Sequence, residues 1–170
     1  MPEARIHSFA PVVGQAPQLL VLGSMPSVAS LRAGQYYGNP RNHFWHLMAD
    51  VLGEPSVPQA YGERLAMLMR HGVALWDALE SCVRPGSLDG DITAAQPNDI
   101  AGLVRAHPTI RAVACNGRAA QSALVRYQHL PEPQPRRILL PSSSPVPTRA
   151  MRAYADRLAA WLVLRDALDA

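Results

Sequence analysis

Short apolar runs alternate along the chain with segments in which apolar residues recur at helical spacing. Four runs closed by turn or polar residues predict buried strands at 19–22, 72–77, 110–115 and 137–140. Helical spacing between and after them predicts helices at 27–33, 44–52, 61–70, 98–106, 118–127 and 149–168. Ser27 and Asn98 are the expected N-terminal caps. We expect an extended arm at 1–17 and a long loop at 80–93.

This alternation of strands and helices predicts an α/β fold. We expect a three-layer α/β/α sandwich with a central, mainly parallel sheet of four strands. Residues 1–170 should form a single domain, because this length suits one sizeable core. The loops that follow the four strands then share one sheet edge, where open α/β sheets bind ligands. These loops are 23–42, 77–89, 116–117 and 141–149.

Charge and apolar length narrow the function classes. The net charge is +3 and every cation among the 16 Lys and Arg residues is arginine, which permits a polyanionic partner. Without lysine, no lysine side chain can form a Schiff base. No apolar run approaches the roughly 20 residues of a membrane span, and the N-terminus lacks the pattern of a secretory signal. We therefore expect a cytoplasmic protein with no membrane partner.

No cofactor or metal motif stands out in the sequence. It contains neither the G-x-G-x-x-G pattern of dinucleotide sites nor a P-loop. Cys82 and Cys115 are too few for a zinc or iron–sulfur site built from cysteines alone, and we expect both to be buried thiols. His43 and His46 show no metal-binding spacing. The expected cofactor and metal content is therefore none.

The loop at 23–42 is dense in polar and aromatic side chains. It carries two adjacent tyrosines, two asparagines and a guanidinium group near its end: Tyr36, Tyr37, Asn39, Arg41 and Asn42. A carboxamide cannot take up a proton at neutral pH, but it can orient a water molecule or hold the edge of a base. Asp77, at the end of the second strand, is the best-placed carboxylate.

Motifs in these loops resemble the uracil-DNA glycosylase superfamily, and within it the hypoxanthine-DNA (deoxyinosine) glycosylase branch. The matching segments are Gly23–Ser27, Tyr36–Asn42, Leu75–Asp77, Gly86–Asp89 and Pro141–Pro145. Mismatch-specific uracil glycosylases share part of this pattern, at Tyr37, Pro40, Asn42, Phe44 and Trp45. The resemblance implies a monomeric DNA repair enzyme. It would hydrolyse the N-glycosidic bond of a deaminated base, hypoxanthine first, and leave an abasic site.

The resemblance also implies site residues, with one departure. Ser24 and Met25 stand where relatives carry a catalytic Asn or Asp, so Asn39 or Asn42 is expected to position the water instead. Asn42 could equally cap the helix that starts near Phe44. Asp77 is expected either to activate water or to read a purine N1–H, with a loop anchor as the alternative.

The remaining expected contacts divide between the base and the DNA backbone. Tyr37 is the expected stacking platform for a flipped base, and the segment Gly23, Ser24 and Met25 is expected to bind it through the backbone. Asn116 either faces the base or turns strand into helix. The expected DNA contacts are Arg41, Ser142, Ser143, Ser144 and Arg149 at phosphates, with Val146 and Pro147 as a wedge.

Three other functions remain open at this point. A mismatch-specific uracil glycosylase would share the fold, and so would a nucleic-acid binder that has lost catalysis. A serine esterase using Ser24 or Ser144 is disfavoured because the sequence lacks the G-x-S-x-G elbow.

A glycosylase without lysine is expected to be monofunctional, leaving the DNA strand uncut at the abasic site.

Overall fold

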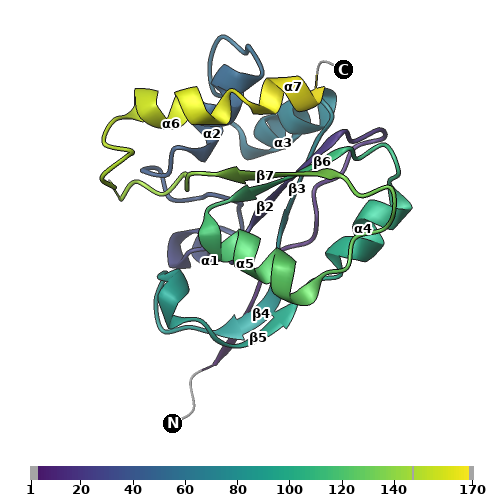
Figure 1. Cartoon of the computed structure of the whole chain (residues 1–170). Coiled ribbons are helices and arrows are strands. Elements are labelled where there is room, and N and C mark those ends of the chain that lie inside the picture. Colours follow the sequence, from purple (N-terminus) through teal and green to yellow (C-terminus); the bar gives the residue numbers. More distant parts are fainter. Residues whose placement is uncertain (1–3, 147, 169–170) are drawn as a thin grey trace.

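A four-stranded parallel sheet forms the centre of the computed structural model, which describes residues 4–146 and 148–168. The strand order is β3-β2-β6-β7 (Figure 1). The strands are β2 (Leu19–Gly23), β3 (Val73–Asp77), β6 (Ala112–Asn116) and β7 (Arg136–Leu140), each within two residues of its predicted bounds. All three neighbouring pairs are parallel. The predicted α/β fold is confirmed.

Helices cover both faces of this sheet (Figure 1). One face packs against α2 (Phe44–Val51), α3 (Tyr61–Arg70), α6 (Tyr154–Trp161) and α7 (Leu164–Leu168). The other packs against α4 (Ile100–Ala106) and α5 (Arg118–Tyr127). Along β2, Leu19 and Val21 join the first core, and Leu20 and Leu22 the second, because successive side chains of a strand point to opposite faces.

A second, antiparallel sheet lies outside the predicted layers, in the order β1-β4-β5. Its strands are β1 (Arg5–His7), β4 (Leu79–Val83) and β5 (Thr93–Pro97). The prediction of an unbroken loop at 80–93 was therefore wrong. Part of the predicted N-terminal arm is β1, which pairs Ile6 with Cys82; residues 1–3 of that arm lie outside the described residues. The pairing partners are far apart in sequence, so local patterning does not reveal them.

The closing helix predicted at 149–168 is divided in the structure. It begins only at Tyr154, where the backbone N–H of Ala153 donates to the carboxylate of Asp156, and α6 ends at Trp161 before α7 starts. Arg165 of α7 donates to the backbone carbonyls of Asp50 and Val51, which docks α7 on the end of α2. The contact between Arg165 and the end of α2 thus fixes the position of α7.

Two predicted caps have different outcomes. Ser27 caps α1 (Val28–Ala33), since its hydroxyl accepts from the N–H of Ser30. The expected cap Asn98 is wrong: Asp99 caps α4, accepting from the N–H of Gly102. Asn98 is instead buried and donates to the backbone carbonyls of Asp77 and Leu79, so it joins the strand end to β4.

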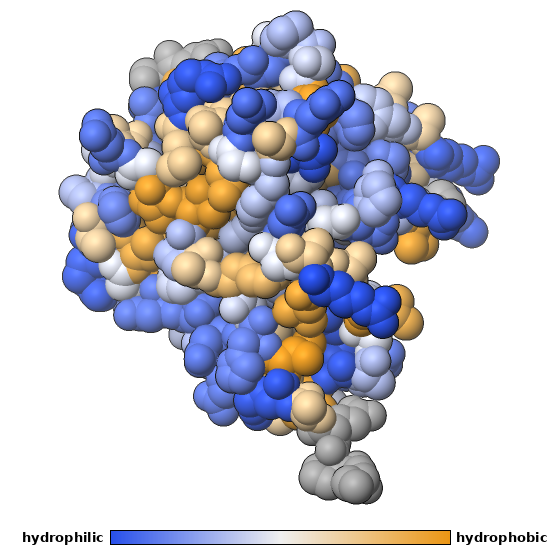
Figure 2. All heavy atoms as spheres, turned by 180° about the vertical axis from the view of Figure 1, so that it is seen from behind, coloured by the Kyte–Doolittle hydropathy of each residue, from blue (hydrophilic) through white to orange (hydrophobic). Residues whose placement is uncertain are grey.

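The surface seen from behind is mixed in character. Seen from behind, apolar patches are bordered by hydrophilic side chains (Figure 2).

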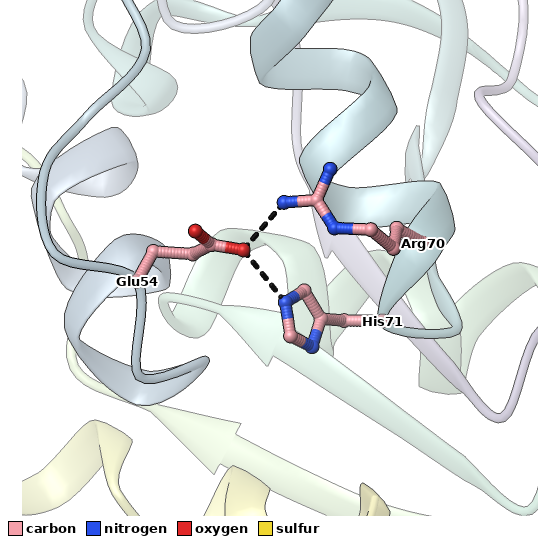
Figure 3. Close-up of polar contacts among 3 residues, drawn as sticks. All are labelled: Glu54, Arg70 and His71. Carbon is pink, nitrogen blue, oxygen red and sulfur yellow. Dashed lines mark hydrogen bonds and ion pairs between the residues drawn. The ribbon is translucent and has the colours of Figure 1, made fainter.

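Glu54, in the loop after α2, holds both Arg70 and His71 at the end of α3 (Figure 3). These bonds, that of His71 first, lower the pKa of Glu54. In the part of the chain that the structure describes, no helix has the length and apolar character to cross a bilayer.

Candidate functional site

A cavity of about 290 Å³ opens at the carboxyl ends of the central strands. The first strand of the central sheet in chain order, β2, lies between β3 and β6, so the connections from β2 to β3 and from β3 to β6 run in opposite directions across the sheet. Such a reversal is where open α/β sheets bind ligands. Most predicted site residues line this cavity: Gly23, Ser24, Met25, Tyr37, Asn39, Asn42, Asp77, Asn116, Ser142, Ser143, Ser144 and Val146.

Two other predicted residues lie outside its lining. Arg41 is exposed on the loop beside it. Arg149 lines an adjoining cavity of about 810 Å³, which shares Asp89, Ser142, Ser144 and Val146 with the first. Pro147 lies outside the described residues.

Asn116, the last residue of β6, joins three segments at the cavity wall. Its amide nitrogen donates to the hydroxyls of Tyr37 (3.0 Å) and Ser143 (2.9 Å). Its carbonyl oxygen accepts from the backbone N–H of Ser143 at 2.9 Å. Both halves of the carboxamide are therefore engaged within the protein. Gly117 follows with a φ of +92°, where the chain turns into α5, and Asn116 itself lines the cavity.

Tyr37 is held in an unusual backbone conformation. Its φ is +52°, a left-handed value that is uncommon for residues other than glycine. The ring stacks on Phe44, with 3.9 Å between centroids and 19° between planes. Burial, and then the charge of Asp77, raises the pKa of the phenol far above its ordinary value, so it stays neutral. Because Phe44 covers one face of the ring, only the other face is available to the cavity.

The two candidate asparagines both bind the local backbone through their side-chain oxygens. Asn39 accepts from the N–H of Arg41 at 3.0 Å, closing a tight turn. Asn42 accepts from the N–H of Phe44 at 2.9 Å, at the start of α2. Among the described residues, neither amide nitrogen has a hydrogen-bond partner. Asn42 therefore binds the first N–H of α2 although His43, and not Asn42, is the N-cap residue. Both asparagines line the cavity.

Gly23 and Asp77 are register partners on neighbouring strands. A Cβ added to Gly23 would lie 2.4 Å from Asp77 Oδ1 and 2.9 Å from the hydroxyl of Tyr37, so only glycine fits. Asp77 is 3% exposed, and its Oδ2 has no hydrogen-bond partner among the described residues. Burial first, and then the charge of Asp89, raises the pKa of Asp77 to about 7, against a lowering effect of Arg84.

The loop after β4 contributes residues for which no base-binding role was predicted. The carboxylate of Asp89 accepts from the hydroxyl of Ser24 at 2.6 Å, and Asp89 lines the cavity. Ser87 accepts from the backbone N–H of Val28 at 2.9 Å. Arg84 is buried and donates to the backbone carbonyls of Gly86 and Pro26. The Gly86–Asp89 motif was the available signal, but its partners are distant in sequence.

A buried arginine shapes the serine loop after β7. Arg157 of α6 donates to the backbone carbonyls of Ser142 (2.9 Å) and Val146 (2.8 Å). Ser143 is 1% exposed, so its side chain serves the cavity wall, whereas Ser142 is exposed. Val146 is 63% exposed at the rim. The loop thus presents an apolar side chain to solvent from a braced backbone.

Groups that are absent from the described lining limit the reactions that the cavity can catalyse. Its lining, within the described residues, contains no histidine that could serve Ser24 or Ser144 as a general base. Among the described residues there is also no group of three His, Cys, Asp or Glu side chains placed to hold a metal ion. The arrangement offers amides, hydroxyls, one stacked phenol and two carboxyl groups, which suits binding of a flat polar molecule.

Comparisons with known proteins agree on one family. A model of the uracil DNA glycosylase superfamily matches residues 11–165. Two proteins named hypoxanthine DNA glycosylase are similar: one from Methanosarcina acetivorans, 39% identical over 67% of this chain and 72% of its own, and one from Methanosarcina barkeri, 36% identical over 66% and 71%. A solution NMR structure from M. acetivorans, assigned provisionally as a uracil DNA glycosylase, superposes with a TM-score of 0.80 at 32% identity, covering 98% of this chain and 100% of the other.

Proposed function

The chain belongs to the uracil DNA glycosylase superfamily, and from that membership we propose that it removes hypoxanthine from DNA containing deoxyinosine. The observation that carries this choice of base is the similarity to two proteins named hypoxanthine DNA glycosylase. The cavity supports it chemically. Hypoxanthine offers an N1–H donor and acceptors at O6, N7 and N3, and the lining offers amides, hydroxyls and a buried carboxyl group to meet them.

Base recognition begins with extrusion of the nucleotide from the helix. A base inside a duplex is out of reach of the cavity, so the target must be flipped into it. Tyr37 is the stacking platform, because its ring is fixed by stacking on Phe44 and by the hydrogen bond that its hydroxyl accepts from the amide of Asn116. Stacking of a base on an aromatic ring contributes about 1–3 kcal/mol. The rigid placement of Tyr37 lowers the ordering cost of that contact.

Hydrolysis needs a water molecule directed at C1′ of the sugar. Asn39 is the residue that positions this water, and it stands in for the Asn or Asp that the Ser24–Met25 segment lacks. Asn42 supports it indirectly, since its oxygen holds the start of α2 and hence Phe44 under Tyr37. Neither amide acts as a general base, because a carboxamide does not accept a proton at neutral pH.

The rim of the cavity binds the DNA. The exposed Ser142 and the guanidinium groups of Arg41 and Arg149 contact phosphates flanking the flipped nucleotide. Val146 fills the space left in the base stack, as inserted apolar side chains do in proteins that bend DNA. Its 63% exposure on a loop braced by Arg157 supports this role, because a loop held in place presents the wedge without further ordering.

The enzyme works as a monofunctional monomer that leaves an abasic site. The chain has no lysine whose side chain could form an imine with C1′ and cut the strand. The abasic product therefore stays intact until alkali or heat is applied. Borohydride should trap no protein on the DNA.

Oligonucleotides carrying one deoxyinosine, deoxyuridine or deoxyxanthosine test the proposal directly. Each is offered single- and double-stranded, incubated with the protein and then treated with alkali. Cleavage of the deoxyinosine strand only after alkali supports the proposal. Cleavage at deoxyuridine in mismatches instead would make the protein a mismatch-specific uracil glycosylase. A gel shift of every oligonucleotide without cleavage would identify a binder that has lost catalysis.

A further inference from the structure

Resting on the proposed function, we propose that Asp77 acts as a neutral carboxyl group that donates a hydrogen bond to the flipped purine as its glycosidic bond breaks. Asp77 ends β3 and faces the cavity beside Gly23 and the hydroxyl of Tyr37. This gives the residue a catalytic role that is neither water activation nor a structural anchor.

The position of Asp77 points to a ligand. The side chain is 3% exposed, yet Oδ2 lacks a hydrogen-bond partner among the described residues. Buried polar atoms without partners are rare in folded proteins, and each one calls for an explanation. Gly23 leaves room for the carboxyl group where any side chain would collide with it. A base in the cavity supplies the missing partner.

The charged and titratable groups around Asp77 favour its neutral form. Asp89, in the 3-10 helix η1 (Asp89–Asp91), places a like charge nearby, and Tyr36 and Tyr37 interact with Asp77 without carrying a charge themselves. Arg84 opposes them, but two of its nitrogens are bound to the backbone carbonyls of Gly86 and Pro26. Burial and Asp89 prevail, which raises the pKa of Asp77 to about 7.

The reaction explains why a neutral acid is useful here. When the bond from C1′ to N9 breaks, its electron pair goes to the base, and negative charge spreads over the purine ring. A carboxylate at this wall would repel that charge, whereas a neutral carboxyl group stabilises it by donating a hydrogen bond. The water oxygen forms the new bond to C1′. The proton released by that water balances the charge of the departing base.

The test is the pH dependence of hypoxanthine release from a deoxyinosine duplex, measured in single turnover between pH 5 and 9. With the unsubstituted protein, the rate should fall as pH rises through about 7. Asp77→Asn keeps the shape and a permanent N–H donor, so its rate at pH 6 should stay within about 10-fold and lose the alkaline fall. Asp77→Ala removes the donor and should lose about 100-fold or more at every pH.

Two carboxylate variants serve as controls. Asp89→Asn removes a charge that raises the pKa of Asp77, so the fall in rate should move to lower pH. Asp166→Asn, on the exposed side of α7 away from the cavity, should leave the profile unchanged. A thermal melt of each variant shows whether it is folded.

One further outcome would contradict the role of Asp77 alone, and another would contradict the proposed function. A rate that rises with pH in the unsubstituted protein, together with a loss of more than about 100-fold in Asp77→Asn, would make Asp77 a general base and overturn the inference alone. Absence of release at every pH from the unsubstituted protein would overturn the proposed function, and the inference with it.

Discussion

Asn116 and Ser143 bind each other twice, with the amide of Asn116 donating to the Ser143 hydroxyl and its carbonyl oxygen accepting from the Ser143 N–H, both at 2.9 Å. The pair ties the end of β6 to the loop after β7. The same amide also donates to Tyr37. A single side chain therefore fixes the stacking ring against the serine loop, and the geometry of the cavity depends on it.

Replacing Asn116 should damage stability and activity together. Asn116→Ala leaves the Ser143 N–H and hydroxyl and the Tyr37 phenol without this partner, which should cost about 1–3 kcal/mol of unfolding free energy. Chemical denaturation measures that loss, and the single-turnover rate on deoxyinosine DNA should fall with it. Gln134→Ala, an exposed amide far from the cavity, is the matched control and should change neither quantity. Full stability in Asn116→Ala would contradict the structural role.

Gly23 should tolerate no side chain. In Gly23→Ala the new Cβ would collide with Asp77 Oδ1 and the Tyr37 hydroxyl, so the cavity must deform. A displacement of this size at a reacting centre should lower the rate by about 100-fold. Gly62→Ala is the control: it lies in α3 with nothing within 4 Å of the added Cβ, and it should stabilise the helix by about 1 kcal/mol. Normal activity in Gly23→Ala would refute the close packing.

Melting temperatures of the alanine variants should distinguish the roles of the two asparagines. Asn39→Ala should lose about 100-fold in single-turnover rate while its melting temperature stays unchanged, because its oxygen holds only a surface turn. Asn42→Ala should lose about 1 kcal/mol of stability along with activity, because its oxygen serves the start of α2. If Asn39→Ala keeps its rate while Asn42→Ala loses it without a change in melting temperature, the two roles are reversed.

Asp77 should make stability depend on pH. An acid whose pKa is about 7 when folded and about 3.9 when unfolded opposes folding increasingly between those values. Below pH 4 both states are protonated and the effect vanishes; above pH 7 it is complete, on the order of 4 kcal/mol as an upper bound. Asp77→Asn should therefore be more stable than the unsubstituted protein at pH 8 but equal to it near pH 4. Equal stability at both pH values would show that Asp77 is not perturbed.

The central sheet was predictable because its signals are local. Each parallel strand is a short apolar run ended by a polar or turn residue, and the helices at 61–70 and 118–127 match their predicted bounds. The second sheet was missed because β4 mixes buried Ser81 and Cys82 with exposed Glu80, and its stability comes from pairing with β1 and β5. Such pairing is invisible to local patterning.

The candidate site shows the same contrast between local signals, which could be predicted, and tertiary contacts, which could not. Parallel strands bring their carboxyl ends together, so Gly23, Asp77 and Asn116 could be placed at one edge from sequence alone. The contacts that shape the cavity could not. Ser24 meets Asp89 across 65 residues, and Arg157 reaches the backbone of Ser142 from a helix whose start was misplaced. These are tertiary pairings of a single side chain with one distant partner.

Identification of the released base tests the central claim most directly. A duplex with one deoxyinosine is incubated with the protein in single turnover, and the small molecules are separated and weighed by mass spectrometry. We predict free hypoxanthine in amounts equal to the abasic sites formed, with the strand uncut before alkali. No free base from this duplex, or free uracil from a matched deoxyuridine duplex in its place, would contradict the proposal that this cavity excises hypoxanthine.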